Sequence, residues 1–195
     1  IPSHEDETAA GDAIEAWLCA ETDAAVERDP HGNVVARRGP GADSPLVGRE
    51  DTTSLALVGH HDVVPPDDSQ VKADGSYVVT ERDGRLSGRG TADMKGSLAA
   101  AMLAFRDADP GRAAAKDGDA TREGATAHDG SVDLVFASFV GEEDGGVGCR
   151  AAIDDGFAPD YAVVGDGSTG YSAPGVTDVA VAHKGRRGST LVADG

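Results

Sequence analysis

Apolar positions in the first part of the chain recur at helical spacing. Ile14, Trp17 and Leu18 fall on one face of the segment Glu5–Ala20, which predicts an amphipathic helix. Ser3 stands just before this segment, and a serine hydroxyl can accept one of the unpaired backbone N–H groups at a helix start. We therefore expect Ser3 to be the N-cap.

Three short, mostly apolar runs follow, at Leu55–Val58, Val132–Val140 and Tyr161–Val164. Such runs are typical of central strands that are covered on both faces. Helical patterns lie between them, at Gly96–Phe105 and at about Gly146–Asp154. The alternation of strand and helix predicts an α/β fold in which helices pack on a sheet.

Turn residues indicate two hairpins and one long loop. Asp83-Gly84 is a strong hairpin signal, because Asp-Gly suits the left-handed backbone of a two-residue turn. The segment Asp107–Gly130 is polar and rich in Gly and Ala, so we expect a surface loop there. The hairpins would join Val26–Arg28 to Asn33–Ala36 through Asp29–Gly32, and Val78–Thr80 to Arg85-Leu86 through Asp83-Gly84.

The chain is strongly acidic, with 35 Asp and Glu against 17 Lys and Arg and a formal net charge of −18. This charge repels phosphates and anionic lipids, so we expect neither nucleic acid nor a membrane as a partner. The acidic residues are mostly Asp and the basic ones mostly Arg. We interpret this composition as a halophile-like adaptation to high salt, where counter-ions screen the self-repulsion.

Cys19 and Cys149 are the only cysteines, too few for a disulfide framework or a zinc knuckle, and we interpret both as small apolar helix residues. No apolar run reaches membrane-span length and no signal peptide is visible, so a cytoplasmic location is the default expectation. The chain begins at Ile1 without Met and ends at Gly195 within an apparent strand. From this we expect a piece of a longer protein.

Polar residues that carry chemistry stand where predicted strands end. In open α/β sheets, ligands bind beyond the carboxyl ends of the strands, so these side chains can converge. Histidine together with several carboxylates is a ligand set for zinc and similar divalent ions, and carboxylates this crowded repel one another unless cations neutralise them. The four sets are Gly59-His60-His61-Asp62, Gly88–Asp93, Gly141-Glu142-Glu143-Asp144 and Gly165-Asp166.

Each set has an ordinary alternative when it is taken alone. A histidine after a strand is most often a surface or core residue, a Glu-Glu pair is usually solvated, and an Asp at a helix start is usually a cap. A serine hydrolase is disfavoured because Gly165–Thr169 lacks the Gly-x-Ser-x-Gly spacing. A phosphate-binding loop is disfavoured because Gly88–Gly96 lacks a Gly-Lys-Ser ending. The joint occurrence of the four sets favours a metal site.

In this order, the sets resemble the motifs of the co-catalytic metallopeptidase family, which includes aminoacylase, acetylornithine deacetylase, succinyl-diaminopimelate desuccinylase and carboxypeptidase G. The resemblance implies a three-layer αβα zinc-peptidase catalytic domain with a mostly parallel mixed sheet over residues 1–183. It also implies a connector and the first strand of an α+β lid domain over residues 184–195. The matching segments are Gly59–Pro65, Gly88–Gly96, Gly141-Glu142-Glu143 and Val164-Gly165-Asp166.

The resemblance implies a pair of divalent metal ions and a ligand set for them. His60 and Asp166 would bind the first ion, Glu143 would bind the second, and Asp93 would bridge the two. We expect zinc, with cobalt or manganese as alternatives.

Two further residues would act beside the metals. Asp62 would accept the other ring N–H of His60 and fix its tautomer. Glu142 would take a proton from a metal-activated water as that water attacks an amide carbonyl. Because neighbours on a strand face opposite sides, Glu142 and Glu143 are expected on a loop. The implied reaction is hydrolysis of an amide bond in N-acyl amino acids or short peptides, of the deacylase or carboxypeptidase type.

Departures from the family pattern keep alternatives open. His61 replaces a small or apolar residue, and we expect it to be a solvent-facing rim residue rather than a spare ligand. Asp166 stands where many deacylases have Glu, so a dipeptidase or aminopeptidase is an alternative, as is a non-catalytic metal-binding module. The family's second-metal His and lid His would follow Gly195, so we expect this chain alone to bind metal weakly and to lack turnover. Relatives often dimerise through the lid, which makes a homodimer a further expectation.

Overall fold

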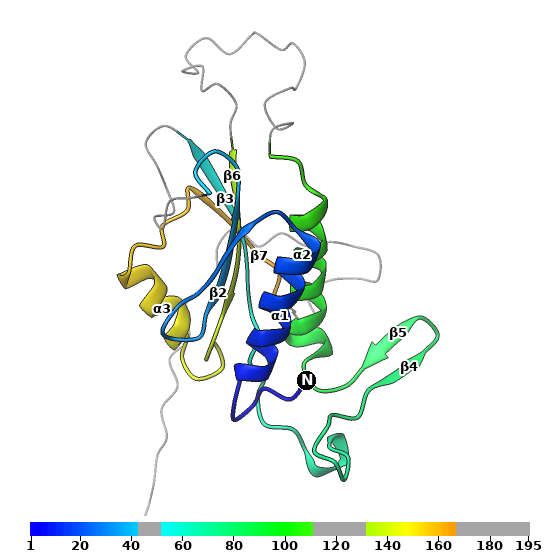
Figure 1. Cartoon of the computed structure of the whole chain (residues 1–195). Helices are drawn as coiled ribbons and strands as arrows, with labels where there is room; N and C mark the ends of the chain where they lie inside the picture. Colours follow the sequence, from blue (N-terminus) through cyan, green and yellow to red (C-terminus); the bar gives the residue numbers. More distant parts are fainter. Residues whose placement is uncertain (43–51, 111–131, 167–195) are drawn as a thin grey trace, which may run out of the picture.

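A mixed β-sheet divides the structure into three layers. The computed structural model describes residues 1–42, 52–110 and 132–166. Helices α1 (Thr8–Glu21) and α2 (Gly96–Asp107) lie on one face of the sheet, and α3 (Val147–Asp154) lies on the other (Figure 1). The predicted αβα layering is thus confirmed. Across the sheet, the strands are β1 (Ala25–Arg28), β2 (Val34–Arg38), β6 (Val132–Phe139), β3 (Thr53–His60) and β7 (Tyr161–Val164).

Parallel pairing brings the ends of three strands to one edge of the sheet. β3 pairs in parallel with β6 and β7, while β2 pairs antiparallel with β1 and β6. Within this sheet β2 alone runs against the other strands, which confirms the predicted mostly parallel mixed arrangement. His60, the last residue of β3, lies opposite Phe139, the last residue of β6. The segments that follow these strands therefore emerge side by side, where ligands bind in open α/β sheets.

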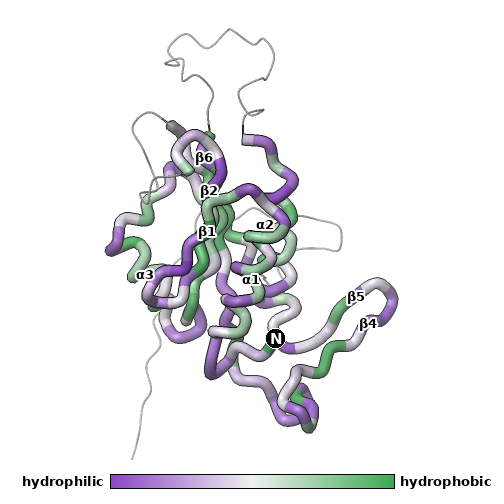
Figure 2. The backbone as a smooth tube through the Cα atoms, in the orientation of Figure 1, coloured by the Kyte–Doolittle hydropathy of each residue, from purple (hydrophilic) through white to green (hydrophobic). Residues whose placement is uncertain are grey.

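Side chains of β6 alternate between two apolar layers, as expected for a strand covered on both faces. Phe136 faces the α1 and α2 side, where its ring centroid lies 6.1 Å from that of Phe105 on α2. Phe139 faces the α3 side and packs edge-on against Phe157 at 5.4 Å. Burying a phenylalanine side chain fully contributes about 1.5–3 kcal/mol, so these rings help to hold the three layers together. Figure 2 shows hydrophobic residues, in green, along the strands at the centre of the molecule and hydrophilic residues, in purple, in many of the surrounding turns.

The helices and hairpins fall close to the predicted segments. In α1, Ile14 and Leu18 are buried and Trp17 packs against the same core, as predicted. The second hairpin consists of β4 (Thr80–Arg82) and β5 (Arg85–Ser87), which form a separate sheet that extends away from the main one (Figure 1). Its turn residues have φ angles of 52° and 72°, the left-handed conformation that Asp-Gly predicts.

The prediction that Ser3 caps the first helix is wrong. The helix begins at Thr8, too far along the chain for Ser3 to reach its first turn, and Asp6 accepts the Thr8 backbone N–H instead (2.9 Å). Ser3 is buried, its backbone N–H donates to the hydroxyl of Tyr77 (3.1 Å), and its own hydroxyl accepts a hydrogen bond from Lys95 (2.7 Å). Ser3 thus holds the start of the chain against the segment that leads into α2.

The prediction that Tyr161–Val164 is covered on both faces is also wrong. Tyr161, Val163 and Val164 are each more than half exposed. Among the described strands, β7 lies at the edge of the sheet and pairs with β3 alone, so an apolar run here does not indicate a central position.

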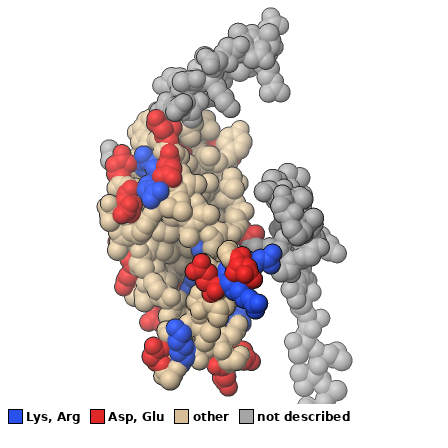
Figure 3. Space-filling model, turned by 90° about the vertical axis from the view of Figure 1, so that its right-hand side faces the viewer, with Lys and Arg blue, Asp and Glu red and all other residues tan. Residues whose placement is uncertain are grey.

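Charged side chains of both signs share the surface. On the face drawn in Figure 3, carboxylates lie in several groups, most of them beside a Lys or Arg side chain. Within the described residues, no helix is long and apolar enough to cross a membrane. Cys19 and Cys149 are free and lie on α1 and α3, as predicted, although Cys19 is exposed. Most of the predicted Asp107–Gly130 loop, and the predicted boundary at residue 184, lie outside the described residues.

Candidate metal centre

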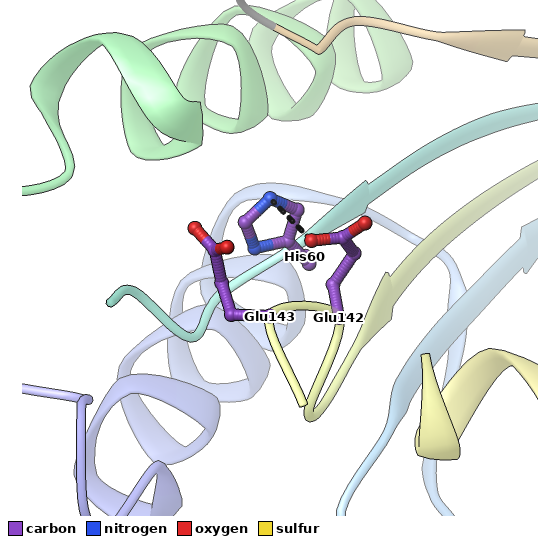
Figure 4. Close-up of side chains that lie close together, drawn as sticks. All are labelled: His60, Glu142 and Glu143. Carbon is purple, nitrogen blue, oxygen red and sulfur yellow. Dashed lines mark ion pairs between the residues drawn. The ribbon is translucent and has the colours of Figure 1, made fainter. Parts of the chain in front are cut away.

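Four segments that are far apart in sequence meet at the edge where β3, β6 and β7 end. His60 closes β3, and Asp166 follows β7. Asp93 lies on the turn η2 (Thr91–Lys95) that leads into α2. Glu142 and Glu143 lie on the turn that leaves β6 (Figure 4). The five side chains come from the four sets singled out in the sequence.

These side chains gather around the imidazole of His60. The ligand atoms of His60, Glu142 and Glu143 lie within 4.8 Å of one another, and so do those of His60, Asp93 and Asp166. Nε2 of His60 lies 3.2 Å from a carboxylate oxygen of Asp93 and 3.9 Å from one of Glu142. Because His60 belongs to both groups, either group, or both together, could hold a metal ion at this ring.

The imidazole forms the buried floor of the site and the carboxylates form an open rim. His60 is 3% exposed, whereas the side chain of Glu142 is 53% exposed. Glu143 and Asp166 are likewise exposed. A ligand could therefore approach the carboxylates from solvent while the ring behind them stays fixed by packing.

The predicted contact between Asp62 and His60 is present. One oxygen of the buried Asp62 carboxylate lies 3.1 Å from Nδ1 of His60, and the other accepts a hydrogen bond from the backbone N–H of Glu143 at 2.9 Å. Burial would raise the pKa of Asp62, but the hydrogen bonds from His60 and from the backbone of Glu143 and Glu142 outweigh it and lower that pKa. Asp62 is therefore a charged acceptor that leaves Nε2 of His60 free to face the rim.

The carboxylates favour positive charge at the His60 ring. Burial by itself would lower the pKa of His60, but the hydrogen bond and charge of Asp62, followed by the charges of Glu142 and Asp93, outweigh it and raise that pKa to about 9. The pKa of Glu143 is raised by burial and then by repulsion from Asp93 and Glu142. A cation in this position would relieve the repulsion. One histidine with several carboxylates is also a donor set that suits zinc and similar ions, so these residues fit a divalent metal.

Glu142 and Glu143 both reach the site because they lie on a glycine-rich turn, as predicted. Gly141, Gly145 and Gly146 have φ angles of 60°, 85° and 71°, a backbone conformation that glycine adopts without strain. The turn reverses the chain between β6 and α3, so two consecutive side chains face the same ring instead of opposite sides of a strand.

Asp93 is held in place by its neighbour in sequence. Met94 is buried against β3, and its sulfur accepts a hydrogen bond from the backbone N–H of His60 at 3.2 Å. The peptide bond between Asp93 and Met94 is cis. Lys95 fixes the other side of this turn through hydrogen bonds to the carbonyl of Ile1 (2.6 Å) and the hydroxyl of Ser3 (2.7 Å).

The prediction that His61 faces solvent at the rim is wrong. His61 is 1% exposed, and its Nδ1 lies 2.8 Å from the hydroxyl of Ser138 on β6. Successive side chains on an extended chain point to opposite sides. Because the His60 side chain points toward the rim, the His61 side chain points into the interior. Burial lowers the pKa of His61 to about 4, so the ring is neutral at neutral pH. His61 belongs to neither ligand group.

Two residues for which the sequence indicates only a place in secondary structure also contact the Glu142 turn. Glu7 accepts a hydrogen bond from the backbone N–H of Gly141 (3.2 Å), and Asn33 accepts one from the backbone N–H of Val140 (3.0 Å). Each partner is more than a hundred residues away in the chain. No spacing or composition in the sequence signals either contact.

Comparison with known proteins supports the same segments. The family model of Peptidase family M20/M25/M40 matches residues 56–116, which contain His60, Asp62 and Asp93. Succinyl-diaminopimelate desuccinylase of Bordetella petrii is 37% identical over 146 residues, which cover 71% of this chain and 31% of that protein. N-formyl-4-amino-5-aminomethyl-2-methylpyrimidine deformylase of Halalkalibacterium halodurans is 34% identical over 123 residues, which cover 61% of this chain and 24% of that protein.

A solved structure shares the fold. An M20 family metallo-carboxypeptidase of Sulfolobus solfataricus aligns with a TM-score of 0.57 and 17% identity, over 84% of this chain and 34% of that one. The chain thus spans 31% and 24% of the two sequence relatives and a similar share of the structural one. Together with the motifs and the fold, these matches identify the chain as carrying a domain of peptidase family M20/M25/M40.

Proposed function

We propose that the protein to which this chain belongs hydrolyses an amide bond in N-acyl amino acids or short peptides, with two divalent metal ions bound at the His60 edge of the sheet. The observation that carries this proposal is the gathering of four carboxylates from three separate segments around one buried imidazole. Carboxylates in a merely solvated charge cluster gain nothing from converging, whereas a metal-dependent hydrolase needs this donor set.

Four residues would hold the ions. His60 and Asp166 would bind the first, Glu143 would bind the second, and Asp93 would serve both. The group of His60, Asp93 and Asp166 supports the first part of this assignment. Zinc is the proposed metal, with cobalt or manganese as substitutes that accept the same oxygen and nitrogen donors. When bound, such ions lower the pKa of water and polarise the amide carbonyl.

Glu142 is the proposed general base. Its carboxylate lies 3.9 Å from Nε2 of His60 and is more than half exposed, so it can reach both the metal centre and an incoming substrate. It would accept the proton of the attacking water and donate it to the leaving nitrogen. Asp62 would keep the proton of His60 on Nδ1, so that Nε2 remains a ligand.

The names of the sequence relatives favour removal of an acyl group as the reaction. One is called a desuccinylase and the other a deformylase of an N-formyl compound. A dipeptidase or aminopeptidase activity is the alternative, because Asp166 stands where many deacylases have Glu. A panel of N-succinyl, N-formyl and N-acetyl amino acids, tested beside unblocked dipeptides, distinguishes these classes.

Glu142→Gln in the whole protein, assayed with added zinc, tests the proposal. Gln keeps the size of Glu but cannot take a proton, so we expect turnover to fall by roughly 10²–10⁴-fold. Zinc binding to the 195-residue chain, measured by calorimetry, should change little. Asp144→Asn removes a neighbouring exposed carboxylate on the same turn and should leave both measurements unchanged.

The results of this experiment distinguish a general base from a metal ligand, and an enzyme from a metal-binding module. Full turnover in Glu142→Gln would reject Glu142 as the base, and loss of zinc binding in that variant would make it a ligand instead. Zinc bound with no turnover on any amide of the panel would favour the non-catalytic metal-binding module.

A further inference from the structure

Three side chains from outside the Glu142 turn accept its backbone N–H groups. They come from three different parts of the fold, namely the N-terminus of α1, the turn between β1 and β2, and the segment after β3. The pairs are Asn33 with Val140 (3.0 Å), Glu7 with Gly141 (3.2 Å) and Asp62 with Glu143 (2.9 Å).

Backbone hydrogen bonds close the turn on itself, from Gly146 to Gly141 (2.8 Å) and from Gly145 to Glu142 (3.1 Å), but its own side chains do not fix it against the rest of the fold. Glu142 and Glu143 are exposed, and Gly141, Gly145 and Gly146 contribute no side chains that could pack. Glycine also leaves the backbone more freedom than any other residue does. A misplacement of about 1 Å in a catalytic group can cost 10²-fold in rate, so the position of this turn matters to the proposed reaction.

Glu7 is placed to fix the turn at the residue before Glu142. The half-buried Glu7 directly precedes α1, and its Oε2 accepts the Gly141 N–H. The same oxygen lies 3.8 Å from Nε2 of His61, a distance too long for a hydrogen bond. That nitrogen is buried and has no hydrogen-bond partner among the described residues.

His61 limits where the Glu7 carboxylate can lie. The ring is fully buried and is fixed at Nδ1 by the hydroxyl of Ser138, 2.8 Å away. The carboxylate therefore lies between a rigid ring and the Gly141 N–H. Through Glu7, the position of α1 is coupled to a turn 134 residues away in sequence.

We propose that Glu7 is a positioning residue, which holds Gly141 so that Glu142 and Glu143 face the His60 ring. The catalytic consequence of this assignment rests on the proposed function, but the structural role does not. Asp62 fixes the far side of the same pair at Glu143, so Glu7 and Asp62 together hold the dipeptide at both ends.

The test compares Glu7→Ala with Glu7→Gln in the 195-residue chain. Ala removes the acceptor, whereas Gln retains an oxygen that can accept the Gly141 N–H. Glu5→Ala, which removes an exposed carboxylate two residues away, is the matched control. Hydrogen exchange of the Gly141 and Glu143 amides in the metal-free chain reports the position of the turn without requiring any chemistry. Exchange should accelerate by at least about tenfold in Glu7→Ala and return toward wild type in Glu7→Gln, because a tenfold change corresponds to about 1.4 kcal/mol, the size of one hydrogen bond.

Cobalt then serves as a spectroscopic probe of the site. We expect Glu7→Ala to bind cobalt roughly 10–100-fold more weakly and to change the visible absorption of the bound ion, as loss of a supporting contact does in metal sites. Glu7→Gln should restore most of the affinity, and Glu5→Ala should match the wild type. In the whole protein, kcat should fall in Glu7→Ala more than KM rises, because the group that is displaced acts in the transition state.

Specific results would overturn the proposal. Unchanged amide exchange at Gly141 in Glu7→Ala would do so, as would equal losses in Glu7→Ala and Glu7→Gln, or losses that merely follow a lower melting temperature. If the whole protein binds no cobalt, the proposed function fails, and the exchange data alone still decide whether Glu7 holds the turn.

Discussion

The carboxylate of Asp62 accepts a hydrogen bond from the backbone N–H of Glu143 at 2.9 Å. Its other oxygen lies 3.1 Å from Nδ1 of His60, so one buried side chain fixes both the ring and the turn that face each other across the site. An isolated carboxylate beside a histidine would orient the ring alone. Because Asp62 does both, a change at this residue should disturb the proposed ligands His60 and Glu143 at once.

Asp62→Asn should therefore weaken metal binding more than the loss of the contact with His60 alone would. The amide can present an oxygen to only one of the two N–H donors, and its NH₂ group then opposes the other. We expect zinc affinity to fall by at least about 10–100-fold, measured by competition with a chromophoric chelator. Asp68→Asn, the same change at an exposed position on the 3₁₀ turn η1 (Asp68–Gln70), should bind zinc as the wild type does. Equal affinity in both variants would contradict this account.

Zinc should raise the stability of the folded chain. It would bind the assembled site and relieve repulsion between carboxylates that lie far apart in the unfolded chain. Ligand at 100 times its Kd adds about 2.7 kcal/mol, which corresponds to a rise in Tm of roughly 5–10 °C for a chain of this size. A chelator should reverse the shift, as read by differential scanning fluorimetry. His60→Ala should abolish most of it, since His60 belongs to both ligand groups. A shift of full size in His60→Ala would show that zinc binds elsewhere.

The net charge of −18 predicts that salt stabilises the fold. Raising the ionic strength from about 0.1 M to 1 M shortens the Debye length from about 10 Å to about 3 Å, which screens repulsion between the carboxylate groups on the surface. Each 1 kcal/mol gained should raise Tm by about 2–4 °C. An uncharged osmolyte at matched osmolarity separates screening from general exclusion effects. A Tm in dilute buffer that equals or exceeds the Tm in molar potassium chloride would contradict the halophile-like interpretation.

The sequence predicts those parts of the molecule that depend on local patterns. Mostly apolar runs give β3 and β6, helical spacing gives α1 and α2, and Asp83-Gly84 gives the β4–β5 turn. Positions after parallel strands bring His60, Glu143 and Asp166 to one edge of the sheet, because parallel strands end at a common edge.

The predictions that are wrong concern contacts between residues that are far apart in the chain. His61 is buried because Ser138, 77 residues away, receives its ring, and Ser3 is buried because Tyr77 and Lys95 close over it. The hydrophobic pattern of a segment predicts that it packs, but not which residues it packs against. For this reason the pattern also fails to predict that β7 is exposed. The anchors Glu7 and Asn33 are missed for the same reason.

Arg38 should contribute to stability by capping the end of α2. One guanidinium nitrogen donates to the carbonyls of Phe105 (2.8 Å), Arg106 (3.1 Å) and Ala108 (2.8 Å), and Nε donates to Asp23 (2.7 Å). The last carbonyls of a helix lack partners within the helix, and this one side chain satisfies those of Phe105 and Arg106. Arg38→Met should lower the free energy of unfolding by about 1–3 kcal/mol in urea titrations. Arg82→Met, at a highly exposed position on β4, should not change it.

Gly148 on α3 should resist a substitution that usually stabilises helices. Alanine in place of glycine within a helix is ordinarily favourable by about 0.5–1 kcal/mol. At Gly148, however, the added Cβ would contact Oδ1 of Asn33 and lie 2.6 Å from the carbonyl oxygen of Val140. Asn33 is fully buried, with its amide nitrogen donating to Asp29 (2.6 Å) and to the carbonyl of Gly148 (3.0 Å), so it cannot move aside.

We therefore expect Gly148→Ala to destabilise the fold by about 1–3 kcal/mol and to loosen the Val140 end of the Glu142 turn. Gly11→Ala on α1 is the matched control, because its Cβ would meet only the guanidinium end of Arg28, which can swing outward. Gly11→Ala should be neutral or stabilising by up to about 1 kcal/mol. Urea denaturation of the two variants gives the comparison, and zinc affinity should fall in Gly148→Ala alone. The same sign of stability change in both variants would show that Asn33 does not fix the junction between β6 and α3 rigidly, since a mobile Asn33 would accommodate the methyl group as readily as Arg28 does.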